Sequence, residues 1–215
     1  MSYTALLNIL PQVTALIFAA LAILSIVTVA VAIFKITQFG RLGVGRHKLA
    51  ETILDDWLNG RPDEAQRRAK AEPSVLARVL SAVMSGLRAR PADPAYGEEL
   101  ARQTAIVQLS QMNSRMRILD AVVQAAPMLG LLGTVVGMID AFGNLALTQQ
   151  VADAQLLASG IWTALTTTAI GLIIALIAFS LAAWLEGRIE DERETIEMVV
   201  SAAIHGRAEQ TIARR

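Results

Sequence analysis

Threonine hydroxyls are the groups in the apolar stretches of this chain whose type and spacing could pass a proton. Thr134 lies in one uncharged stretch, and Thr163, Thr167 and Thr168 lie in the next. A threonine in a membrane helix commonly donates to the carbonyl one turn earlier, so any one of them can be purely structural. Because Thr163 and Thr167 are one helical turn apart and Thr168 follows directly, we predict instead a hydrated seam along a helix.

Ionisable groups are missing from these stretches. Residues 121–139 and 154–185 contain no charged side chain, and Asp120 and Asp140 flank the first of them. Twenty helical residues separate these two carboxylates by about 30 Å, the thickness of the hydrocarbon layer. Proton pumps usually place an ionisable group inside the membrane, so a titrating group would have to come from another chain. Asp140 either binds an ion at the membrane surface or only marks the end of a span.

Small residues predict close contact between the helices that carry the hydroxyls. Gly133 and Gly137 form a GxxxG pair, and Gly130 and Gly171 extend the small-residue surfaces. Leucines gain little by hiding from lipid tails, so membrane helices associate where small residues let their backbones approach. We predict that these four glycines are packing positions, and that Pro127 kinks its helix.

Composition indicates a membrane protein and argues against several other classes. Of the 215 residues, 54% are hydrophobic, the mean hydropathy is +0.48 and the net charge is zero. The chain has no cysteine, and neither His47 nor His205 has metal-ligand spacing around it, so we expect no metal and no cofactor. No nucleophile or base constellation indicates an enzyme. A neutral chain gives no reason to expect nucleic acid, whereas a lipid bilayer is the expected surrounding.

The distribution of basic residues predicts the topology. Of the 19 Lys and Arg residues, 14 lie between Lys35 and Arg117 and the other 5 follow Leu185. The positive-inside rule therefore places the middle and the end of the chain in the cytoplasm. The predicted organisation is a periplasmic segment (1–12), transmembrane helix 1 (13–34), a cytoplasmic helical region (35–117), transmembrane helix 2 (118–142), a periplasmic connection (143–155), transmembrane helix 3 (156–185) and a cytoplasmic C-terminal helix (186–215).

Helical periodicity continues outside the membrane. Apolar residues recur at steps of three and four from Ile106 to Val123 without a helix breaker, which predicts one helix rising from the cytoplasm into the second span. Apolar positions from Ile189 to Ala203 predict that the third span also continues into the cytoplasm. The expected fold is all-α, with helices 2 and 3 extending into a cytoplasmic helical bundle.

Two motifs resemble a known family. The sequence PMLGLLGTVVGM at 127–138 resembles the second-span signature of the MotA/TolQ/ExbB proton channel family, and ALTTTAIGL at 164–172 resembles its third-span signature. The length and the short outer connection are closer to ExbB and TolQ than to MotA. ExbB and TolQ usually have a Glu before the Ala-Leu of the third span, where this chain has Trp162 and Thr163.

The resemblance implies a function and partners. It implies a homo-oligomeric ring of five copies in the bacterial inner membrane, around an ExbD/TolR-like single-span protein that carries the transmembrane aspartate. Thr134 and Thr168 match the positions that face this aspartate. Such a motor uses the proton motive force to energise an envelope process such as TonB-dependent import, through a TonB/TolA-like protein. The alternative is a non-conducting scaffold ring that anchors other envelope proteins.

Overall fold

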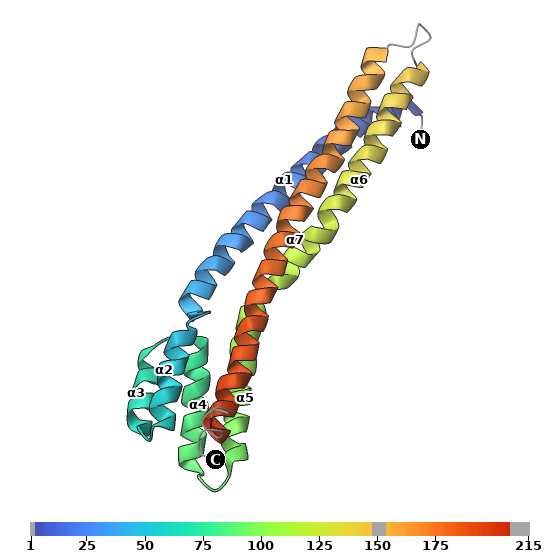
Figure 1. Ribbon diagram of the computed structural model, residues 1–215. Coiled ribbons are helices and arrows are strands. Elements are labelled where there is room, and N and C mark those ends of the chain that lie inside the picture. The colour runs from blue at the N-terminus through green and yellow to red at the C-terminus, as the bar shows by residue number, and fades with distance from the viewer. Residues whose placement is uncertain (1–2, 148–153, 207–215) are drawn as a thin grey trace. The chain divides into compact units, whose positions relative to one another are not determined.

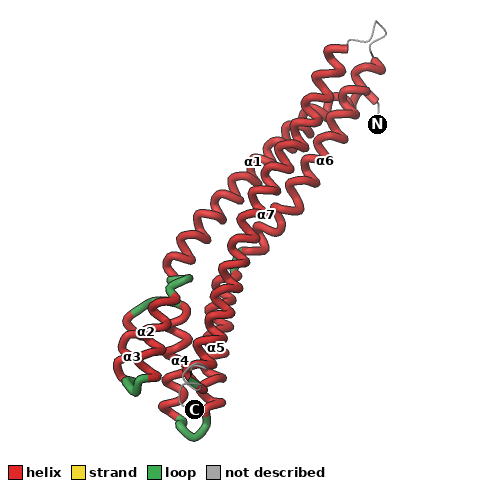
Figure 2. Tube along the Cα trace, viewed as in Figure 1, coloured by secondary structure: helices red, strands yellow, loops and turns green. Residues whose placement is uncertain are grey.

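The computed structural model describes residues 3–147 and 154–206, so parts of the predicted outer connection and of the C-terminal segment lie outside the described residues. Figure 2 shows that the described chain is helical apart from short loops. The described residues form seven helices, labelled in Figure 1: α1 (Tyr3–Leu42), α2 (His47–Leu58), α3 (Pro62–Ala71), α4 (Val75–Ala89), α5 (Pro94–Asn113), α6 (Met116–Leu147) and α7 (Ala154–His205).

The predicted all-α membrane fold is confirmed. Three helical stretches among the described residues are long and apolar enough to cross a membrane. The predicted continuation of the third span is also confirmed, because α7 runs as one helix of 52 residues to His205. The chain divides into two compact units: residues 1–33 with 115–183, and residues 34–114 with 184–215.

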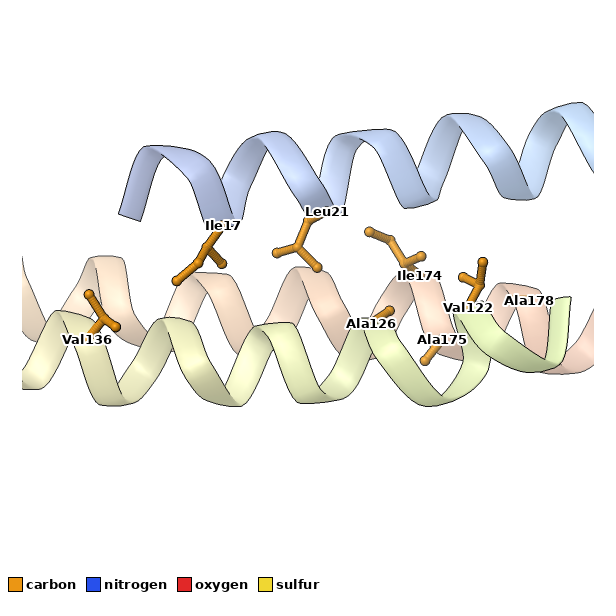
Figure 3. Close-up of a cluster of buried hydrophobic side chains, with 8 residues drawn as sticks. All are labelled: Ile17, Leu21, Val122, Ala126, Val136, Ile174, Ala175 and Ala178. Atoms are coloured by element: carbon orange, nitrogen blue, oxygen red, sulfur yellow. The ribbon is translucent and has the colours of Figure 1, made fainter. Parts of the chain in front are cut away.

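The first unit packs α1, α6 and α7 around a small apolar core. Ile17 and Leu21 point from α1 toward the other two helices, as Figure 3 shows. Opposite them the core contains alanines, among them Ala126, Ala175 and Ala178. Alanines at these positions allow the backbones to approach, which is how helices gain contact inside a membrane.

The second unit is built around α4, whose apolar side is fully buried. Its buried residues are Val75, Leu76, Ala77, Val79, Leu80, Val83, Met84 and Gly86. The Ser74 hydroxyl caps the helix by accepting from the Ala77 N–H at 3.2 Å. Gly86 packs directly on Gly97 of α5, where an added Cβ would lie 2.5 Å from the Gly97 Cα. This glycine pair sets the close spacing of α4 and α5.

A buried carboxylate joins α7 to the loop after α1. Glu192 is 1% exposed, and its Oε2 accepts from the Gly45 N–H at 3.0 Å. Gly45 has a φ of +84°, which a residue with a side chain rarely adopts. Burial raises the pKa of Glu192, and the Gly45 N–H and the positive charges of His47 and Arg188 oppose that rise.

The prediction of one continuous helix into the second span is wrong, because α5 ends at Asn113 and α6 begins at Met116. Arg115 in the intervening turn has a φ of +66°. The carbonyls at the end of α5 are bound by side chains of α1: Lys35 Nζ donates to the Met112 carbonyl at 2.5 Å, and Gln38 Nε2 donates to the Gln111 carbonyl at 2.8 Å.

These two donors explain the interruption. Lys35 is fully buried, and its ammonium lies 5.7 Å from the ring centre of Phe39. A cation at a helix C-terminus satisfies carbonyls that have no helical partner and complements the negative end of the helix dipole. The end of α5 is therefore fixed by residues more than seventy positions earlier in the chain.

Candidate functional site

The candidate site is the contact between α6 and α7, which we call the seam. Its close approach depends on residues without bulky side chains. An added Cβ at Gly137 would lie 2.8 Å from the Ala164 Cβ, and one at Gly133 would collide with the Thr167 side chain. Both approaches are closer than real Cβ contacts, so any larger residue at these glycines would force the helices apart.

The same arrangement continues along the two helices. An added Cβ at Gly130 would lie 2.9 Å from the Thr168 Cα, and one at Gly171 would lie 2.5 Å from the Ala126 carbonyl oxygen. All four glycines that the sequence singled out thus lie in contacts between α6 and α7. Pro127 lies beside Ala126, and α6 remains helical through it.

Two threonines of α7 meet one carbonyl of α6. Thr168 Oγ1 donates to the Gly130 carbonyl at 2.8 Å. Thr167 Oγ1 is 2.6 Å from the carbonyl of Ala164 on its own helix and 3.4 Å from the Gly130 carbonyl. Thr167 is fully buried, whereas Thr168 is half-buried. The glycine at position 130 exposes its carbonyl to both hydroxyls because no side chain covers it.

The other two predicted hydroxyls do not join this contact. Thr134 Oγ1 donates to the Leu131 carbonyl at 2.7 Å, and Thr163 Oγ1 donates to the Ser159 carbonyl at 3.0 Å. Each bond stays within its own helix, and both side chains are partly exposed. The structure therefore brings Thr167 and Thr168 to the Gly130 carbonyl across the seam, and leaves Thr134 and Thr163 bonded within their own helices.

The hydrogen bonds define what the hydroxyls can do. Each of the four donates its hydrogen to a backbone carbonyl, so its oxygen lone pairs remain to accept a hydrogen bond. Such a lone pair can receive a hydrogen bond from water, from hydronium or from a protonated carboxyl group. The seam can thus stabilise a proton carrier, but it contains no threonine that would itself titrate at neutral pH.

A polar cavity of about 370 Å³ lies beside the seam within the first unit. Asp140 lines it, and its Oδ1 accepts from Asn144 Nδ2 at 3.1 Å. Thr163 and Ser159 of α7 line it as well. Sequence reasoning did not single out Asn144 or Ser159, although each is one helical turn from a residue that it did consider. In the part of the chain that the structure describes, no group of three His, Cys, Asp or Glu residues could hold a metal.

Comparison with known proteins places the seam inside a matched region. Residues 71–198 match the MotA/TolQ/ExbB proton channel family. A putative biopolymer transport protein, an ExbB homolog of Methanothermobacter thermautotrophicus, is 30% identical over 184 residues, which are 85% of this chain and 63% of that protein.

Two further relatives show the same likeness. A putative ExbB-like biopolymer transport protein of Synechocystis is 30% identical over 160 residues, covering 74% of this chain and 62% of that protein. The biopolymer transport protein exbB1 of Vibrio cholerae is 36% identical over 96 residues, covering 43% of this chain and 42% of that protein. The chain thus spans less than two thirds of the length of these relatives.

Proposed function

Because the chain belongs to the MotA/TolQ/ExbB proton channel family, we propose that it is a proton-channel subunit of an ExbB/ExbD- or TolQ/TolR-type motor. The observation that carries this proposal is the pair of hydroxyls that meet the Gly130 carbonyl within the matched region. In the proposed motor, the proton motive force energises an envelope process such as TonB-dependent import. The contribution of this chain is to bind and hydrate the proton carrier, not to catalyse a reaction.

The titrating group of the proposed motor belongs to a partner. The apolar stretches at 121–139 and 154–185 have no charged residue. The seam between them therefore offers hydrogen-bond acceptors without a group that gains or loses a proton. An ExbD/TolR-like single-span protein would bring a carboxyl group to the half-buried Thr168. A hydroxyl that already donates to a carbonyl can accept from the carboxyl when it is protonated. When the proton departs, the same hydroxyl offers the carboxylate no donor, so this contact favours the protonated, loaded form of the partner's carboxyl group.

The proposed setting is the bacterial inner membrane. The distribution of Lys and Arg supports periplasmic segments at 1–12 and 143–155, and cytoplasmic segments at 35–117 and 186–215. About five copies of the chain would surround the partner. The motor would act on a TonB/TolA-like protein. A charge that moves across 100 mV releases about 2.3 kcal/mol, which is the energy available for each step.

The test is proton flux through proteoliposomes that contain the complex isolated from the host membrane. Thr168→Val keeps the shape of the side chain and removes the acceptor. Loss of one hydrogen bond worth about 1.4 kcal/mol to the moving carboxyl group should lower the flux about tenfold. A pH-sensitive dye inside the vesicles measures the flux under an imposed potential.

Thr166→Val is the matched control. Thr166 is also half-buried, and its Oγ1 also donates to a backbone carbonyl at 2.8 Å, but to that of Trp162 on its own helix and not to Gly130 on α6. This variant should conduct like the wild type. Unchanged flux in Thr168→Val, with equal amounts of complex in the vesicles, would contradict the proposal.

A scaffold ring is the second candidate function. Its support is that Thr134 and Thr163 form hydrogen bonds only within their own helices, as purely structural threonines do. Under this hypothesis Thr134→Val and Thr168→Val leave function intact. Gly133→Leu would still disrupt assembly, because a side chain there collides with Thr167.

A further inference from the structure

The polar cavity of the first unit is formed where α1, α6 and α7 meet. Thr14 lines it from α1, Asp140 and Asn144 from α6, and Ser159 and Thr163 from α7. All five are oxygen-bearing side chains, in a unit whose other interior residues are largely apolar. The volume of about 370 Å³ far exceeds the ~30 Å³ that one water molecule occupies in the liquid. A cavity with this lining and size has room for several water molecules and polar groups to bind them.

Small residues hold α6 and α7 in close contact at the border of the cavity. Gly137 and Gly160 line the cavity, and an added Cβ at Gly160 would lie 2.6 Å from the Ala141 Cβ. The same Gly137 packs against Ala164 in the seam. The cavity and the seam are therefore two parts of one contact between α6 and α7, the first open and the second closed.

Asp140 supplies the charge of the cavity. Asn144 fixes one of its carboxylate oxygens at 3.1 Å, and no other described residue of the lining is titratable. A carboxylate in a recess with low-dielectric walls raises the local concentration of cations. Thr163, in the same lining, is one helical turn from Thr167 at the Gly130 carbonyl. The cavity thus ends one helical turn from the hydroxyls of the seam.

We propose that this cavity is a water-filled cation-binding vestibule in which Asp140 concentrates hydronium for the seam. The assignment rests on the proposed proton-channel function for the identity of the cation. The hydrated, negatively charged cavity is a property of the chain that can be measured without proton flux. Its test is therefore independent of the flux test.

Charge-selective labelling provides the measurement. The chain has no cysteine, so Ser159→Cys introduces the single thiol of this chain into the cavity lining. The purified complex is treated with a cationic and an anionic methanethiosulfonate reagent of similar size, and mass spectrometry follows modification of this chain. The rate ratio of the cationic to the anionic reagent reports the local charge. Adding Asp140→Asn should lower this ratio roughly tenfold.

Asp120→Asn is the matched control. It makes the same change of charge in α6, but about 30 Å away, well beyond the screening length of about 8 Å at physiological salt. The ratio should not change in this variant. A thiol at position 159 that reacts with neither reagent, or a ratio that is the same with Asp140→Asn, would overturn the proposal. A ratio that falls with Asp140→Asn supports the vestibule even if Thr168→Val conducts normally, an outcome that contradicts the proton-channel function alone.

Discussion

A single methyl group decides how closely α6 and α7 can pack. In Gly137→Ala the new Cβ would lie 2.8 Å from the Ala164 Cβ, and the helices must separate or bend to relieve this contact. Overpacking of this kind costs about 1–3 kcal/mol. In the exchange variant Gly137→Ala/Ala164→Gly the methyl moves from one helix to the other, so stability should return in part. Thermal unfolding of the purified protein, followed by tryptophan fluorescence, measures both variants.

Gly187→Ala is the control for this exchange. Gly187 lies in α7, where an added Cβ would meet no atom within 4 Å. Alanine in an open helical position stabilises by about 0.5–1 kcal/mol, so the variant should unfold at or slightly above the wild-type temperature. A double variant as unstable as Gly137→Ala alone would contradict the assigned contact.

The sequence indicated which residues lie where helices touch, but not which way the threonine side chains point. The glycines at 130, 133, 137 and 171 could be chosen from the sequence, because small residues are what membrane helices need where they touch. The sequence could not say which of Thr163, Thr167 and Thr168 reach the neighbouring helix. That depends on the register of α6 against α7, which places Gly130 opposite Thr168 and Gly133 opposite Thr167.

At the scale of elements, the break between α5 and α6 shows the limit of local patterns. The residues around Ser114 contain neither Gly nor Pro, so periodicity predicted a continuous helix. The turn depends on Lys35 and Gln38. Both lie more than seventy residues earlier in the chain, so a pattern of neighbouring residues cannot include them. Helix α7 has no comparable break: it runs as one helix to His205, as the apolar positions from Ile189 to Ala203 predicted.

Lys35→Met should loosen the turn between α5 and α6. The variant leaves the Met112 carbonyl without the buried ammonium, and hydrogen bonds to charged groups contribute about 1.5–3 kcal/mol. We expect faster trypsin cleavage after the exposed Arg115, measured by mass spectrometry of the fragments. Lys35→Arg retains a donor and should be intermediate.

Arg41→Met is the control for the turn. It removes the same charge from the exposed last turn of α1 and should leave the Arg115–Met116 bond as resistant as in the wild type. Equal cleavage after Arg115 in Lys35→Met and Arg41→Met would show that Lys35 does not fix the end of α5.

At the scale of the whole molecule, the first unit presents many large apolar side chains at its surface. Its exposed large side chains include Leu16, Met128, Trp162, Leu165 and Leu176, all more than 60% exposed. Lipid can cover such residues, and so can other chains. Hydroxyls without a titrating group favour at least one partner that brings a carboxyl group.

Native mass spectrometry of the complex isolated gently from the host membrane measures its composition. We expect an integral number of copies of this 23.1 kDa chain, five by the proposed arrangement, plus a smaller remainder. Sequencing of that remainder should identify a single-span protein with an aspartate within its span. Since the seam offers only acceptors, changing this aspartate to Asn should abolish the flux that Thr168→Val lowers. A ring without a companion would leave the seam with no proton to receive, and would favour the scaffold.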